Sequence, residues 1–187
     1  MISLTREQYL DSIQKLRDQG ASFSNRLSSA QLGWQPVGGA RWSILEILDH
    51  LAVFNGGFLN ELGNAAANAP AGGRAGEIRA GGFVSEKFIG FSEPPPKAKV
   101  KATANLAPRP TLNPEKIGPE FLASMDRVAN FVRSTSGKDL NAVRFKNPFI
   151  PLLRFTAASG LLIIGSHTRR HMYQAEQILK EPDFPKS

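Results

Sequence analysis

The stretch Ile163–Leu179 reads IIGSHTRRHMYQAEQIL and contains two of the three histidines of the chain, His167 and His171. Residues four apart lie one helical turn apart on one face, so both imidazoles can reach a single point. The same helical stripe is otherwise mostly apolar, which directs the pair toward a core; it contains Gly160, Ile163, Ile164, Gln174 and Ile178. The sequence therefore predicts a long helix over 152–180 that presents two histidines, which either bind a metal or merely lie at the helix surface.

A second stretch, WSILEILDHLA at Trp42–Ala52, contains the third histidine, His50. Ser43 and Glu46 form an S-x-x-E capping box, which predicts that a helix begins there. His50 lies close to the apolar face of this helix, and a buried imidazole needs partners for its nitrogens. It is either a hydrogen-bonded core histidine or the third ligand of a metal site. The convergence of three histidines favours the metal.

Two further amphipathic helices complete the predicted fold. One runs from about Thr5, which opens a capping box with Gln8, to Gln31. The other ends near Gly137, and its apolar face comprises Ile117, Phe121, Met125, Val128 and Val132. Helices of this number and length predict an all-α protein, a four-helix bundle.

Residues 70–114 form a long connection rich in glycine and proline, which excludes a long helix. The connection either crosses over the bundle, with room for a short helix at Phe83–Phe88, or is partly mobile. A short first connection and this long second one favour an up-down-down-up order of the helices. Residues 138–151 are expected to be irregular, and residues 1–187 to form a single domain.

Composition excludes several kinds of site. The chain has no cysteine, so thiolate ligands, disulfides and a cysteine nucleophile are excluded, and a metal must be held by nitrogen and oxygen. No apolar run reaches the ~20 residues of a membrane span, and no signal peptide is evident, so a cytoplasmic location is expected. The net charge of +7 is scattered. Lys97, Lys99, Lys101 and Arg109 are expected to be solvated surface charges, and nucleic acid is not an expected partner.

The two histidine stretches together resemble the DinB superfamily. The resemblance rests on W-S-x-x-E-x-x-x-H-L at Trp42–Leu51, preceded by WQPVGGAR, and on H-x-x-R-H-x-x-Q at His167–Gln174. Members of that family are four-helix bundles in which one histidine of the second helix and two of the last helix bind a divalent metal. The resemblance implies this fold, and it implies the metal role for His50, His167 and His171. It covers these two helices much better than residues 70–151.

Three neutral imidazoles leave at least one coordination position free, which is typical of catalytic metal sites. Zinc is the expected ion, and nickel, manganese or iron also suit imidazole ligands. Such an ion lowers the pKa of a bound water or thiol.

Three further residues are candidates for a catalytic or substrate-facing role. Glu46 lies one turn before His50 and either orients it or accepts a proton, unless it only closes its capping box. Gln174 shares the histidine face and either binds a ligand or satisfies core polar groups. Arg170 is expected to pair with a carboxylate such as Glu46 or Asp49, or to attract an anionic substrate.

The resemblance implies a metal-dependent transferase that uses a low-molecular-weight thiol, because characterised members include enzymes that use bacillithiol or mycothiol. The substrate would be a small molecule, and a homodimer is compatible with the family. A metal-hydroxide hydrolase is the nearest alternative. The second class of function is a non-catalytic stress-response protein that binds a metal or a small ligand.

Overall fold

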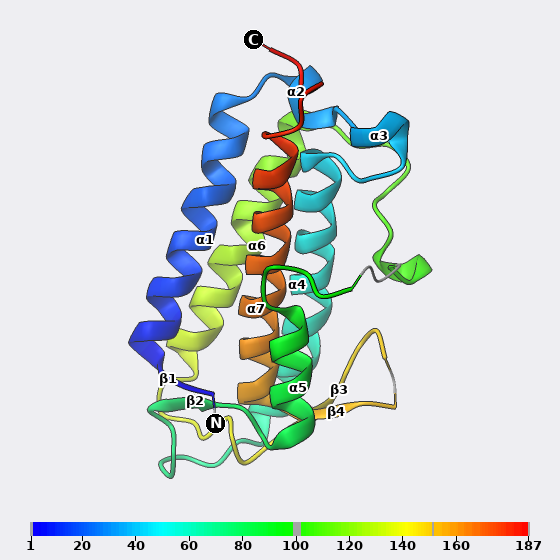
Figure 1. Cartoon of the computed structure of the whole chain (residues 1–187). Coiled ribbons are helices and arrows are strands. Elements are labelled where there is room, and N and C mark those ends of the chain that lie inside the picture. Colours follow the sequence, from blue (N-terminus) through cyan, green and yellow to red (C-terminus); the bar gives the residue numbers. More distant parts are fainter. Residues whose placement is uncertain (1, 99–101, 151, 187) are drawn as a thin grey trace.

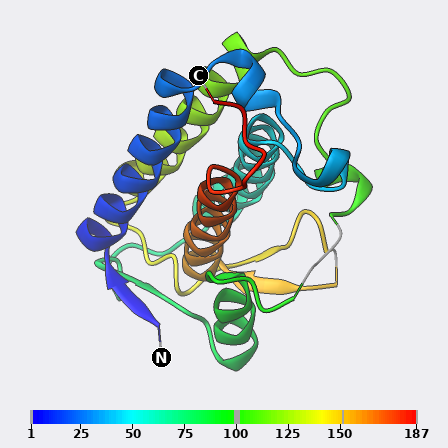
Figure 2. The ribbon, with the colours of Figure 1, turned by 45° about the horizontal axis from the view of Figure 1, so that its top comes forward.

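The computed structural model describes residues 2–98, 102–150 and 152–186, and these are mostly helical (Figure 1). The long helices α1, α4, α6 and α7 pack side by side, as the views of Figures 1 and 2 both show. Their bounds are Arg6–Arg26, Ile44–Ala67, Pro114–Ser134 and Ala157–Ile178. The shorter helices are α2 (Ser29–Gly33), α3 (Pro36–Gly39), α5 (Phe83–Ser92) and the 3-10 turn η1 (Ala104–Leu106). The prediction of a mainly helical protein is confirmed.

Two small antiparallel sheets lie near one end of the long helices, and the sequence did not reveal them (Figure 1). Strand β1 (Ser3–Thr5) pairs with β2 (Glu77–Arg79), and β3 (Arg144–Lys146) pairs with β4 (Arg154–Thr156). The second pair corrects the expectation that 138–151 is irregular throughout. Strands of three residues are too short to show a convincing alternation of apolar and polar residues.

The predicted capping boxes at the starts of α1 and α4 are confirmed. Thr5 accepts the backbone N–H of Gln8 at 3.1 Å, and the Gln8 side chain accepts the N–H of Thr5 at 2.9 Å. Ser43 and Glu46 make the same reciprocal pair at 3.1 and 2.7 Å. Each box satisfies backbone donors that the first helical turn leaves unpaired.

Two predicted helix bounds are wrong, each because an unrecognised cap intervenes. The first helix ends at Arg26 rather than Gln31, since Ser28 caps the separate helix α2 through Gln31. The last helix begins at Ala157 rather than near residue 152. Residues 154–156 pair as strand β4, and Thr156 accepts the N–H of Ser159 at 3.2 Å.

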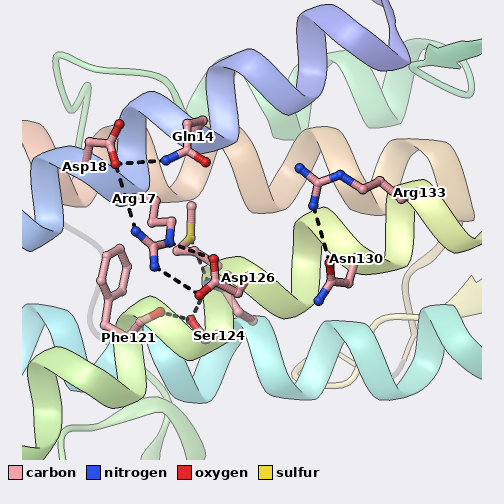
Figure 3. A network of polar contacts seen from close by, with 10 residues as sticks. Gln14, Arg17, Asp18, Phe121, Ser124, Asp126, Asn130 and Arg133 are labelled. Atoms are coloured by element: carbon pink, nitrogen blue, oxygen red, sulfur yellow. Dashed lines mark hydrogen bonds and ion pairs between the residues drawn. The ribbon is translucent and has the colours of Figure 1, made fainter.

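The buried apolar side chains form one cluster among the long helices. Tyr9 of α1 is almost fully buried in it and donates its hydroxyl to the carbonyl of Leu161 in α7 at 2.7 Å. At the surface between α1 and α6, Arg17 donates to both carboxylate oxygens of Asp126, at 2.6 and 3.1 Å (Figure 3). A partly exposed pair of this kind contributes little to stability, so packing holds these helices together.

The described parts of the crossover cover the bundle, and the short helix expected at Phe83–Phe88 is present as α5. Helix α5 packs on α7 (Figure 1), and η1 contacts α4. None of the helices among the described residues has both the length and the hydropathy that crossing a membrane requires.

Candidate metal centre

The structure brings together all three predicted ligands, at the contact between α4 and α7. His50 comes from α4, and His167 and His171 come from successive turns of α7. One ring nitrogen of each residue lies within 4.8 Å of those of the other two. The ring centroids are 4.5 to 5.1 Å apart. Side chains separated by more than 110 positions in the sequence therefore converge on one point.

The orientation of His50 is fixed by a backbone carbonyl of the crossover. Its Nδ1 lies 2.7 Å from the oxygen of Leu106, in η1. A carbonyl only accepts, so Nδ1 carries the proton and donates it. Nε2 then keeps its lone pair and faces Nε2 of His167 at 3.4 Å. This is the tautomer that a histidine needs to bind a metal through Nε2.

The donor set and its spacing fit a divalent cation. Two nitrogens bound tetrahedrally to zinc, each at about 2.0–2.1 Å, lie about 3.3 Å apart. The two facing Nε2 atoms are at 3.4 Å. Among the described residues, the buried Nδ1 atoms of His167 and His171 have no hydrogen-bond partner. Protein groups thus leave part of the bonding capacity of these two rings unused.

Burial keeps the three imidazoles neutral. It is the main cause that lowers the pKa of His50, and it lowers the pKa of His167 and His171 well below the ordinary value. The neighbouring histidines and Arg170 lower the pKa of His167 and His171 further, because a second positive charge nearby is unfavourable. His167 is partly exposed, whereas His50 and His171 are buried.

Aromatic rings enclose the three histidines. Phe54 stacks on His167 with centroids 3.8 Å apart and planes 14° apart. The ring of Trp42 lies 4.9 Å from His50 and 6.2 Å from His171, nearly parallel to the latter. Phe149, between β3 and β4, stacks in turn on Phe54 at 5.5 Å. These contacts restrict rotation of the imidazoles and give the site apolar walls.

The structure places the three candidate helper residues differently. Glu46 closes its capping box and also accepts the side-chain amide of Gln35 at 2.8 Å. Gln174 lies beside His171, where its side chain opposes the lowering of the His171 pKa. The expectation that Arg170 pairs with Glu46 or Asp49 is wrong. Its guanidinium donates to the carbonyls of Phe91 and Ala98, at 3.0 and 2.8 Å. Arg170 therefore ties the crossover to α7.

Three residues around the site were missed or misjudged from the sequence. The carbonyl of Leu106 has no sequence signal, because every residue has one. Asp49 is fully buried beside His50 and pairs with Arg109 of the crossover. Arg109 was expected to be a solvated charge, yet it makes this pair and a second one with Glu120, each at 2.5 Å.

Comparison with protein families agrees with this geometry. The sequence model of the DinB superfamily matches residues 12–175, which include all three histidines. The chain belongs to the DinB superfamily. Curated proteins and solved structures give no significant match. Family membership and the three-histidine cluster together support a site that can hold a metal ion, in the arrangement that the DinB resemblance implied.

Proposed function

We propose that this DinB protein is a divalent-metal-dependent enzyme, and that it transfers a low-molecular-weight thiol to a small electrophilic substrate. The observation that carries the proposal is the convergence of three neutral imidazoles within 4.8 Å, with the lone pair of His50 facing His167. Zinc is the proposed ion. Three protein ligands leave a coordination position for water or substrate, as in catalytic zinc sites.

The direction of the long helices in Figure 1, where α1 and α7 run one way and α4 and α6 the other, supports an up-down-down-up four-helix bundle as the scaffold. Helix α4 packs against both α6 and α7, and α1 packs against the same two helices. This places the ligand-bearing helices α4 and α7 next to each other, so that a bundle core supplies the site.

A bound divalent cation would supply Lewis acidity and stabilise the anionic form of a thiol. The residues of the chain prepare the site for this chemistry. His50, His167 and His171 are held neutral and so present lone pairs at neutral pH. Trp42 and Phe54 exclude water from two sides of the rings. We propose that the substrate approaches on the partly exposed side, that of His167.

The helper residues have unequal support. Gln174 lies beside His171 and is the best placed to hydrogen-bond a ligand or substrate. Glu46 uses Oε2 in its capping box, and Arg170 donates to crossover carbonyls. We therefore propose Gln174 as the substrate-facing residue, and structural roles for the other two. A cytoplasmic location and a homodimer complete the proposal.

Metal analysis of the purified protein tests the site directly. We expect close to one divalent ion per chain in the wild type, and loss of most of it in His50→Ala, His167→Ala and His171→Ala. The control is Gln177→Ala, which changes the same helix α7 at a residue outside the cluster. Full retention of metal in His50→Ala would contradict a site shared between α4 and α7.

Turnover assays distinguish the reaction from its alternatives. The metal-loaded protein is incubated with a model electrophile and bacillithiol, mycothiol or glutathione, with and without chelator. We expect thioether formation that requires both metal and thiol. Metal-dependent hydrolysis without thiol would favour a hydrolase instead, and metal-dependent ligand binding without turnover would favour a non-catalytic binder.

A further inference from the structure

Asp49 and His50 are consecutive residues of α4, and both bind the same short segment of the crossover. His50 donates Nδ1–H to the carbonyl of Leu106 at 2.7 Å. Asp49 accepts the backbone N–H of Arg109 at 2.9 Å and its Nε at 2.7 Å. The segment is therefore attached to α4 at two points that are three residues apart.

The sequence of the segment suits this attachment. Arg109 lies between Pro108 and Pro110, and prolines have no backbone N–H to donate. The N–H that Asp49 accepts is thus the one backbone donor within residues 108–110. A proline also restricts the residue before it to extended conformations, so Pro110 limits the backbone of Arg109.

The ion pair between Asp49 and Arg109 has a strong energetic basis. The carboxylate of Asp49 is completely buried, whereas the Arg109 side chain is 47% exposed. A buried carboxylate without a cation and donors is strongly destabilising, so Asp49 holds the guanidinium firmly. Glu120 of α6 binds the same guanidinium from its outer side at 2.5 Å. Arg109 thus joins α4, α6 and the crossover.

We propose that Arg109 is a positioning residue of the metal centre. By binding Asp49 it fixes the segment 102–109 on α4, so that the Leu106 carbonyl holds His50 as the Nδ1–H tautomer with Nε2 directed at the cluster. This inference rests on the proposed metal function. Partners of metal-bound histidines commonly change metal affinity about 10- to 100-fold when they are lost.

The test compares Arg109→Gln, Arg109→Lys and the matched control Arg127→Gln. Arg127 of α6 borders the same surface hollow of about 440 Å³ as Arg109, and its replacement removes the same charge. Zinc affinity is measured by competition with a chromophoric chelator. We expect affinity to fall about tenfold or more in Arg109→Gln. We expect it to be partly restored in Arg109→Lys and unchanged in Arg127→Gln.

A spectroscopic readout on the metal-free protein separates positioning from general stability. Nitrogen-15 shifts of the His50 ring report which nitrogen carries the proton. We expect the Nδ1–H form in the wild type and in Arg127→Gln, and a mixture of tautomers in Arg109→Gln. A purely structural role would lower the unfolding free energy of Arg109→Gln without changing the His50 spectrum. That result, or unchanged zinc affinity, would overturn the inference.

The two proposals fail in different ways. If the wild type binds no divalent metal, the proposed function fails, whereas the His50 spectra still decide whether Arg109 sets the tautomer. If the wild type binds zinc and Arg109→Gln binds it equally well, only the positioning role fails. Should Arg109→Gln not fold, Arg109→Lys weakens the contact with Asp49, Glu120→Gln weakens only the contact with Glu120, and the same two readouts apply.

Discussion

The titration of His171 and His167 follows directly from their surroundings. The ring centroid of His171 lies 4.5 Å from that of His167 and 4.6 Å from that of His50. Burial first, and neighbouring positive charge second, lower the pKa of each well below its ordinary value. In the unfolded chain these groups titrate near pH 6.5. Between that value and the lower folded pKa, the unfolded chain binds more protons than the folded one.

The metal-free protein should therefore lose stability as the pH falls below about 6.5, while these groups leave stability unchanged above it. Each such histidine contributes a slope of up to about 1.4 kcal/mol per pH unit in that window. Urea unfolding in the presence of a chelator, at pH 7.5, 6.5 and 5.5, measures the effect. His171→Asn should show a smaller decrease. An equal decrease in wild type and variant would show that other groups cause it.

The side-chain part of the site could be predicted from the sequence, whereas the backbone part could not. The spacing of His167 and His171 and their helical phase were enough to predict that they converge. The role of Leu106 depends on how a crossover folds back on α4, 56 positions away in sequence. The partner of Asp49 could not be predicted either, because Arg109 lies in a proline-rich segment that resembles an exposed loop.

Gly20 of α1 allows α1 to approach α6 closely. A Cβ on Gly20 would lie 2.1 Å from the ring of Phe121, which is fully buried in α6. No movement of a flexible side-chain end can relieve this clash, because the Phe121 ring is packed on all sides. Glycine in the middle of a helix normally weakens that helix. The close packing of α1 on α6 explains why position 20 is a glycine.

Gly20→Ala should destabilise the protein by about 1–3 kcal/mol through overpacking. The matched control is Gly63→Ala in α4, where a Cβ would meet nothing within 4 Å. That variant should be stabilised, by up to about 1 kcal/mol, since alanine is the better helix former. Thermal and urea unfolding measure both. If Gly20→Ala proves as stable as Gly63→Ala, the close packing of α1 on α6 described above would be incorrect.

Helices were predicted more accurately than the elements that join them. The capping boxes at Thr5 and Ser43 predicted where two helices begin, because a cap is a local interaction. The strands β3 and β4 pair with each other only through tertiary context and are three residues long. Their formation moved the start of α7 from the expected position near residue 152 to Ala157.

The apolar core of the described residues extends well beyond the histidine cluster. Buried apolar residues extend along all four long helices, while the histidines occupy one part of the contact between α4 and α7. The crossover is fastened separately, by Arg170 to the carbonyls of Phe91 and Ala98 and by a bidentate pair between Arg169 and Glu93. We therefore expect the fold to survive removal of the ion.

Chelation should lower the melting temperature without abolishing the cooperative transition. A ligand present at 100 times its dissociation constant stabilises a protein by about 2.7 kcal/mol, and this is the loss expected on its removal. Calorimetry with and without chelator, followed by addition of zinc, measures the change and its reversal. Complete unfolding on chelation would indicate a structural ion instead.

Trp42 lies close enough to the histidine cluster for its fluorescence to report on the site. Its indole lies 4.9 Å from the His50 ring and stacks near His171, whereas Trp34 packs edge-on against Phe184 at 5.5 Å. The chain contains these two tryptophans and no others. In a Trp34→Phe background, the remaining emission therefore comes from a fluorophore in contact with two proposed ligands. Quenching by Co²⁺ or Ni²⁺, or a spectral shift as a substrate displaces water, would then follow occupancy in real time without any attached dye.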